Sequence, residues 1–180
     1  MDSKRSRRGQ SLLEAMVALS ILTVGFLGLV ALLSKSFFYS REVADKMKAT
    51  YLASEGVEIV KNLIDHDVTL AVVNKGEGGW GSCFSGQIVT GFEVDYKSGE
   101  DYTTQCDHFA PYSASDHLYL DPVTHLYSYD KNGTLTNFTR KIRITQNGDE
   151  IIVQSIVNWS TGPITAQSVE MEDHFYNWHP

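Results

Sequence analysis

The chain has 180 residues, of which 15 are Lys or Arg and 22 are Asp or Glu, and its formal net charge is −7. A chain this acidic repels phosphate backbones, so we expect no nucleic-acid partner. The length allows one domain beside an extended N-terminal helix, and no internal repeat is evident.

The N-terminal segment combines a short basic leader with a long apolar run. Four basic residues lie between positions 4 and 8, and after Glu14 no charged residue occurs before Lys35. A helix of about twenty residues spans about 30 Å, which is the thickness of the hydrocarbon core of a bilayer. This pattern predicts a membrane-spanning helix over residues 12–33. By the positive-inside rule the leader stays cytoplasmic, so we expect everything after Lys35 to be exported.

Glu14 lies at the edge of this apolar run, where a carboxylate is costly. An unpaired carboxylate in a membrane segment costs about 3 kcal/mol, which suggests that Glu14 has a function. An ordinary signal peptide would need a small-x-small cleavage site after its apolar core, and residues 31–35 (ALLSK) provide none. A plain signal anchor stays open, although it explains the apolar run and the basic flank but not Glu14.

The spacing around Gly9 carries a resemblance to a known family. Gly9 is followed by residues 10–14 (QSLLE) and then by the unbroken apolar run. This pattern resembles the signature of type IV prepilins and of the pseudopilins of type II secretion. The resemblance implies that a prepilin peptidase cuts between Gly9 and Gln10 and methylates the new N-terminus at Gln10. It also implies that Glu14 is the assembly carboxylate, which pairs with the N-terminal amine of a neighbouring subunit.

The same resemblance implies a structural subunit rather than an enzyme, namely a minor pilin or pseudopilin of a pilus-like or secretion filament. The precursor would be a single-pass inner-membrane protein with an exported C-terminal domain. Its expected partners are the prepilin peptidase, other pilin or pseudopilin subunits, the inner-membrane assembly platform, and the membrane itself through residues 12–33. The family implies no cofactor.

Two alternatives to a minor subunit remain. Ala31 stands where major pilins often carry a helix-kinking proline, which favours a minor subunit but leaves a major pilin as one alternative. The other alternative is a signal-anchored adhesive surface domain that does not polymerise.

We expect four segments along the chain: a cytoplasmic leader (1–9), a transmembrane and assembly helix (10–34), an amphipathic continuation of that helix (35–66), and an exported β-domain (67–180). Removing the leader would change the count from 15 basic and 22 acidic residues to 11 and 21, which gives a net charge of −10.

Residues 35–66 continue the helical pattern. They contain no proline, and Gly56 is their one glycine. Apolar residues recur at helical spacing on one face, while polar residues such as Glu55 and Asp65 fall on the other. The apolar stripe consists of Ala49, Leu52, Ala53, Val57, Ile59, Val60, Leu63 and Ile64. Residues 51–62 (YLASEGVEIVKN) also resemble the corresponding stretch of PilV-type and GspI-type minor pilins.

The rest of the chain predicts a small antiparallel β-domain packed on this stripe. The fold class is therefore α+β, a pilin fold with a long N-terminal helix on a β-meander. Segments 118–120 and 126–129 flank a turn, and segments 138–145, 150–159 and 164–172 predict the meander. The dipeptide Asn147-Gly148 is a strong hairpin signal between the first two of these.

Two stretches of charged residues are interpreted as solvent-facing. Residues 88–96 alternate between apolar and acidic residues, which predicts a half-buried strand with Glu93 and Asp95 in solvent. Arg140, Lys141 and Arg143 form a small basic patch on a strand, and we interpret it as a solvated face.

The two cysteines, Cys83 and Cys106, lie in the part of the chain that we expect to be exported. Cysteine pairs in exported domains usually oxidise, and a bridge closing the loop between them would stabilise the domain by about 3 kcal/mol. We therefore predict a Cys83–Cys106 disulfide. A metal site is the alternative, but the close CxxC spacing typical of such sites is missing. Its ligands would be Cys83, Cys106, Asp107, His108 and His117.

Catalysis finds little support in the sequence. The six histidines are scattered, and the adjacent pairs Asp65-His66 and Asp116-His117 have no nucleophile signature beside them. No glycine-rich phosphate loop or metalloprotease motif occurs. An exported hydrolase that uses the Asp-His pairs is the one enzymatic alternative left open.

Overall fold

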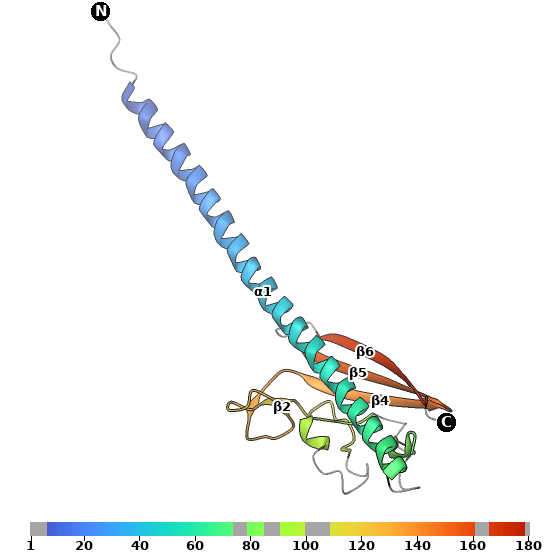
Figure 1. Cartoon of the computed structure of the whole chain (residues 1–180). Coiled ribbons are helices and arrows are strands. Elements are labelled where there is room, and N and C mark those ends of the chain that lie inside the picture. The colour runs from blue at the N-terminus through green and yellow to red at the C-terminus, as the bar shows by residue number, and fades with distance from the viewer. Residues whose placement is uncertain (1–6, 74–78, 85–90, 100–108, 161–165, 179–180) are drawn as a thin grey trace, which may run out of the picture. The chain divides into compact units, whose positions relative to one another are not determined.

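The computed structural model describes residues 7–73, 79–84, 91–99, 109–160 and 166–178. The chain divides into two compact units, Met1–Ala44 and Asp45–Pro180. One helix, α1 (Arg7–Val73), begins in the first unit and ends in the second (Figure 1). The predicted long N-terminal helix is therefore confirmed.

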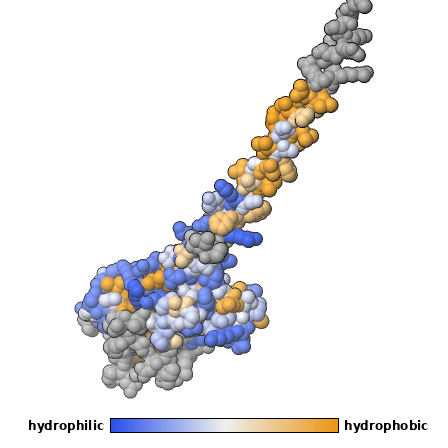
Figure 2. All heavy atoms as spheres, turned by 180° about the vertical axis from the view of Figure 1, so that it is seen from behind, coloured by the Kyte–Doolittle hydropathy of each residue, from blue (hydrophilic) through white to orange (hydrophobic). Residues whose placement is uncertain are grey.

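The first unit exposes its apolar side chains. All of its described residues are helical, and side chains such as Leu22 and Val24 are each 70% exposed. Hydrophobic residues cover most of this part of the helix in Figure 2. A helix that is apolar around its circumference normally lies in a protein core or in a membrane.

The second unit contains the remainder of α1 and two antiparallel sheets. In the main sheet the strands follow the order β4 (Thr139–Asn147), β5 (Glu150–Ser160) and β6 (Ala166–Tyr176). A smaller sheet has the order β2 (Tyr127–Ser128), β1 (Tyr119–Leu120) and β3 (Thr134–Leu135). Two short 3₁₀ helices, η1 (Ser82–Phe84) and η2 (Tyr96–Gly99), lie in the connections.

The core lies between the apolar stripe of α1 and one face of the main sheet (Figure 1). Alternate residues of β5 are buried, from Ile151 to Trp159, which is the period-two pattern of a strand with one covered face. On the helix, Ala49, Ala53 and Val60 have no exposed surface. The predicted packing of a β-meander on this stripe is confirmed.

The hairpin between β4 and β5 turns one residue later than the sequence suggests. Asn147 pairs with Glu150, so the two loop residues are Gly148 and Asp149. Gly148 has a φ of 63°, and a positive φ at the first loop residue alone is typical of a type II′ turn. Asn147 is therefore the last residue of the strand.

Some predicted elements differ from the observed ones, and β6 ends at Tyr176 rather than at residue 172. Helix α1 ends at Val73 rather than near His66, because no glycine or proline interrupts residues 67–73 and buried Asp67 accepts hydrogen bonds from Ser82 at 2.8 Å. In the described part of segment 88–96, Phe92 forms isolated bridges to Ile142 and Pro111 instead of a regular strand.

Gly56 lets α1 approach the main sheet closely. A methyl group at this position would lie 2.5 Å from Oγ of Ser155, 2.9 Å from Cδ1 of Ile142 and 3.1 Å from Cδ of Arg140. The first two separations are shorter than real carbon contacts. Any side chain at this helical position would therefore force neighbouring core side chains to shift.

Arg140, which lies on β4, connects this strand to α1 and to the segment around Val94. It is fully buried, and its Nη1 donates to the carbonyl oxygen of Leu52 in α1 at 3.0 Å. Its Nη2 donates to the carbonyl oxygen of Val94, and Nη1 lies 3.5 Å from Oε2 of Glu55. The expected solvated position of Arg140 is wrong, because its side chain lies on the face of β4 that also buries Ile142.

The other two residues of the basic patch agree better with the prediction. Arg143 is exposed, and Lys141 is half-buried with its Nζ 5.1 Å from the centre of the Tyr112 ring. Only Arg140 is turned into the core. A buried guanidinium needs acceptors to offset its desolvation, and the two carbonyls and Glu55 supply them.

The variant Gly56→Ala should lower the free energy of unfolding by about 1–2 kcal/mol. Alanine favours a helix by about 1 kcal/mol over glycine, but the overpacking costs more. Thermal unfolding of the full chain in detergent micelles, followed by circular dichroism, measures the effect. Gly28→Ala is the matched control because its added methyl has no neighbour within 4 Å. Equal melting temperatures for all three proteins would contradict the close contact.

The variant Arg140→Met should lower the free energy of unfolding by about 3 kcal/mol, because the Val94 carbonyl and Glu55 lose their partner. Arg143→Met removes the same side chain from the exposed face of β4 and should change stability by less than about 0.5 kcal/mol. Chemical denaturation of both variants gives the comparison. Similar losses in the two variants would argue against a specific role for Arg140.

Candidate functional site

The first candidate site is the exposed apolar surface of α1 in the first unit. By length and composition this part of the helix can cross a membrane. Its exposed large apolar residues include Leu12, Leu13, Met16, Val17, Leu19, Ile21, Leu22, Val24, Phe26, Leu27, Leu29, Val30, Leu32 and Leu33. An exposed apolar surface this continuous marks a site of contact with lipid or with other protein.

The hydroxyl groups within this surface are satisfied by the helix itself. Ser20 donates to the carbonyl oxygen of Met16 at 2.7 Å, and Ser34 donates to that of Val30 at 2.9 Å. Thr23 donates to the carbonyl oxygen of Ser20 at 2.9 Å. Because hydrocarbon offers no hydrogen-bond partners, polar groups in a membrane helix must be satisfied internally. The segment meets that requirement at these positions.

Gly9, Gln10 and Glu14 all lie within α1. Gln10 and Glu14 are four residues apart, which is about one turn of the helix, and Glu14 is exposed. The helix thus provides a carboxylate one turn beyond the predicted cleavage point. Cleavage after Gly9, methylation of Gln10 and pairing of Glu14 stay predictions.

A second candidate is the acidic cluster around Arg140 in the second unit. Glu93 and Asp95 are 7% and 9% exposed, so the expectation that they face solvent is wrong. Oε1 of Glu93 accepts the backbone N–H of Ser113 at 2.9 Å, and Oδ2 of Asp95 accepts that of Tyr129 at 3.1 Å. These bonds hold two later segments against residues 91–95, which is the role of a structural anchor.

Burial raises the pKa values of three residues in this cluster. Desolvation is the largest effect on Glu55 and raises the pKa of its carboxyl, while the nearby charge of Arg140 acts in the opposite direction. Desolvation also raises the pKa of Glu93 and, strongly, that of the Tyr129 hydroxyl, which donates to the carbonyl oxygen of Arg140 at 3.0 Å. Sequence patterns gave no sign of this cluster, because its charges suggested exposed faces.

The raised pKa of Glu55 predicts a pH dependence of stability. The folded state binds this proton more tightly than the unfolded state, so the stabilisation is complete below the ordinary pKa of 4.5 and is lost as pH rises through the folded pKa. Glu55→Gln mimics the protonated carboxyl. We therefore expect the melting temperature of the wild type to fall relative to Glu55→Gln between pH 4.5 and pH 7.

Melting curves of the two proteins in detergent micelles over that pH range test this expectation. Glu58→Gln removes an exposed carboxylate from the same helix and serves as the matched control. A constant difference between wild type and Glu55→Gln at every pH would show that folding does not raise the pKa of this carboxyl.

The histidines do not form a hydrolytic site in the part of the chain that the structure describes. His66 is half-buried on α1, and Nδ1 of His117 is buried without a hydrogen-bond partner. His174 lies between Glu150 and Glu172, with nitrogen–oxygen distances of 2.8 and 3.1 Å, and these hydrogen bonds raise its pKa. The geometry of these residues gives the hydrolase alternative no support.

The predicted cysteine pair cannot be placed. Cys106, Asp107 and His108 lie outside the described residues, and so does the side chain of Cys83. The disulfide therefore stays a prediction. Among the described residues no group of three or more His, Cys, Asp or Glu side chains is arranged to hold a metal ion.

Comparison with known proteins identifies the N-terminal segment. A family model described as the prokaryotic N-terminal methylation motif matches residues 4–30. No curated protein and no solved structure matched the chain. The matched region contains Gly9, Gln10 and Glu14 and most of the exposed apolar surface of α1. Proteins with this motif are structural pilin-type subunits. The match does not distinguish a PilV-type or GspI-type subunit from other members.

The methylation motif at residues 4–30, together with the α+β arrangement of a long N-terminal helix and antiparallel sheets, supports the assignment of this chain to the type IV prepilin and pseudopilin family.

Proposed function

We propose that this chain is a structural subunit, a minor pilin or pseudopilin, of a type IV pilus-like or type II secretion filament, and that it has no enzymatic activity. The observation that carries the proposal is the methylation motif over residues 4–30. The exposed apolar surface of α1 supports it, because such a surface is stable only in a membrane or against other apolar helices.

The precursor would be held in the inner membrane by residues 12–33, with the leader (1–9) in the cytoplasm. The basic residues of the leader favour this orientation. The assembly helix (10–34) would continue through the amphipathic segment (35–66). Because α1 ends at Val73, the β-domain would begin after that residue rather than at residue 67. The β-domain would be exported and would end in an extracytoplasmic filament.

Cleavage after Gly9 would change the electrostatics around Glu14. The new amine at Gln10 would become the N-terminus of the helix, and Glu14 would lie just past the first helical turn. The N-terminal end of a helix carries a partial positive charge that stabilises a nearby carboxylate. An amine and a carboxylate from adjacent subunits attract strongly where water is excluded.

Assembly would then follow from two steps. Prepilin peptidase would cut after Gly9 and catalyse transfer of a methyl group from a methyl-donor co-substrate to the amine of Gln10, and the inner-membrane assembly platform would bring subunits together. Glu14 of one subunit pairs with the N-terminus of a neighbour and sets the axial register, while apolar helix faces bury one another. Absence of the helix-kinking proline at Ala31 favours a minor subunit over a major pilin.

The variant Glu14→Ala should insert into the membrane normally but enter filaments about tenfold less often or worse, because a desolvated N-terminal amine would lack its partner. Glu14→Gln should show the same defect, since the charge is what matters. The measurement is the amount of subunit in sheared filaments relative to membranes, by immunoblot in the native host.

Thr23→Ala provides a matched control in the same helix, where the lost hydroxyl bonds only to the Ser20 carbonyl. Normal incorporation of Glu14→Ala would remove the central role of this carboxylate. If the wild-type protein inserts into the membrane normally but never enters filaments, the signal-anchored surface domain would be favoured.

A further inference from the structure

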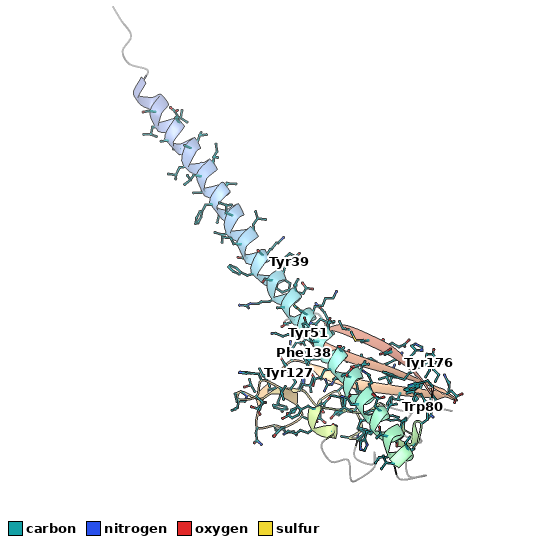
Figure 3. The ribbon with its side chains drawn as sticks, in the orientation of Figure 1. Tyr39, Tyr51, Trp80, Tyr127, Phe138 and Tyr176 are labelled. Atoms are coloured by element: carbon teal, nitrogen blue, oxygen red, sulfur yellow. The ribbon has the colours of Figure 1, made fainter. Side chains whose placement is uncertain are left out.

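A cavity of about 220 Å³ lies in the second unit, where the last turns of α1 meet the end of β6. Trp80 lies by that end of the main sheet, near Tyr176 (Figure 3). The cavity belongs neither to the apolar surface of the first unit nor to the cluster around Arg140. Its lining residues are Asp65, Val68, Thr69, Trp80, Asn177 and Trp178.

Backbone hydrogen bonds of the lining residues hold the walls of the cavity in place. The carbonyl oxygen of Trp80 accepts a hydrogen bond from Nε2 of Gln146 at 3.3 Å, which ties this residue to β4. The backbone N–H of Asn177 donates to the carbonyl oxygen of Asp149 at 2.8 Å and fixes the segment after β6. The cavity is thus formed by three separate parts of the sequence.

The charge in the cavity is negative. Asp65 supplies a carboxylate, and no Lys or Arg occurs among the lining residues. Asp65 is exposed, and within the described residues its carboxylate has neither a hydrogen-bond nor an ion-pair partner. Thr69 donates its hydroxyl hydrogen to the carbonyl oxygen of Asp65 at 2.8 Å, so its oxygen remains able to accept.

Two tryptophans, Trp80 and Trp178, contribute to the lining of the cavity. Trp178 is 78% exposed, whereas Trp159 is 4% exposed and packs in the core of the same domain. Indole faces attract cations through the ring quadrupole, and tryptophan is the strongest of the aromatic side chains in this respect.

We propose that this cavity binds an organic ammonium cation. Two indoles and the carboxylate of Asp65 supply complementary chemistry, and the net charge of −7 raises the local concentration of cations. The volume accommodates a trimethylammonium group. This site is independent of the proposed filament function, because no residue of it lies in the methylation motif.

The test uses the full chain in a polyoxyethylene detergent, which contains neither sugar nor ammonium groups. Choline is titrated against its neutral isostere 3,3-dimethylbutan-1-ol, and binding is followed by the NMR signals of the three indole N–H groups. We expect choline to shift the signals of Trp80 and Trp178 in a saturable way while the signal of Trp159 stays fixed. The neutral isostere should bind at least about fivefold more weakly.

Variants test the two parts of the site separately. Trp178→Leu keeps an apolar side chain but loses the aromatic face, and it should weaken choline binding about tenfold. Asp65→Asn should weaken it about threefold, as expected for an exposed charge. Glu58→Gln, which removes an exposed carboxylate earlier on the same helix, should bind choline like the wild type. Because Asp65 and Trp178 are exposed, all three variants should keep the fold, and the Trp159 signal reports this.

One further cation, Nα-acetyl-lysine amide, separates the sources of the ligand, and glucose tests whether the cavity binds a neutral sugar instead. Tighter binding of Nα-acetyl-lysine amide than of choline would support the proposal with a lysine side chain of a partner protein as the ligand. Tighter binding of choline would support it with a quaternary ammonium compound. Equal binding of choline and its neutral isostere, binding of glucose instead of either cation, or no saturable shift would overturn the proposal.

Discussion

The β-domain depends on one buried interaction, that of the Arg140 guanidinium with α1 and with residues 91–95. A desolvated positive charge must have acceptors, and it obtains them from the Leu52 and Val94 carbonyls and from Glu55. Gly56 leaves room for this arginine, because a methyl group there would lie 3.1 Å from Cδ of Arg140. Helix, main sheet and loop are therefore fixed together by an arginine and a glycine that belong to distant parts of the sequence.

The two halves of α1 are suited to different environments. Its later half packs an apolar stripe against the sheet, while its earlier half exposes apolar side chains and satisfies its own hydroxyl groups. This division accounts for the proposed function in physical terms. The first half is suited to lipid and then to the apolar interior of a filament, and the second half carries the folded β-domain. The proposed cation site adds a binding surface to that domain without involving the assembly helix.

Much of the fold could be predicted because its signals are local. The stripe of residues 49–64, the alternation of β5 and the hairpin signal near Gly148 each depend on residues close in sequence. Alternation does place Arg140 on the same face of β4 as Ile142, but its charge suggested solvent instead of the core. The burial of Glu93 and Asp95 could not be predicted, because residues 92–95 are covered on both sides and form no regular strand. At the N-terminus, Gly9, Gln10 and Glu14 follow from a spacing motif. The cavity between Trp80 and Trp178 joins residues almost a hundred positions apart, so no local pattern indicates it.

The central claim is that this chain is a prepilin-type precursor, and its N-terminus tests that claim most directly. The full chain would be co-expressed with a prepilin peptidase, with an inactive peptidase as control, and analysed by intact mass and N-terminal sequencing. The account predicts a chain that begins at Gln10, has lost the mass of residues 1–9 and carries one added methyl group. An intact chain that begins at Met1 in the presence of the active enzyme would contradict the account and favour a simple signal anchor.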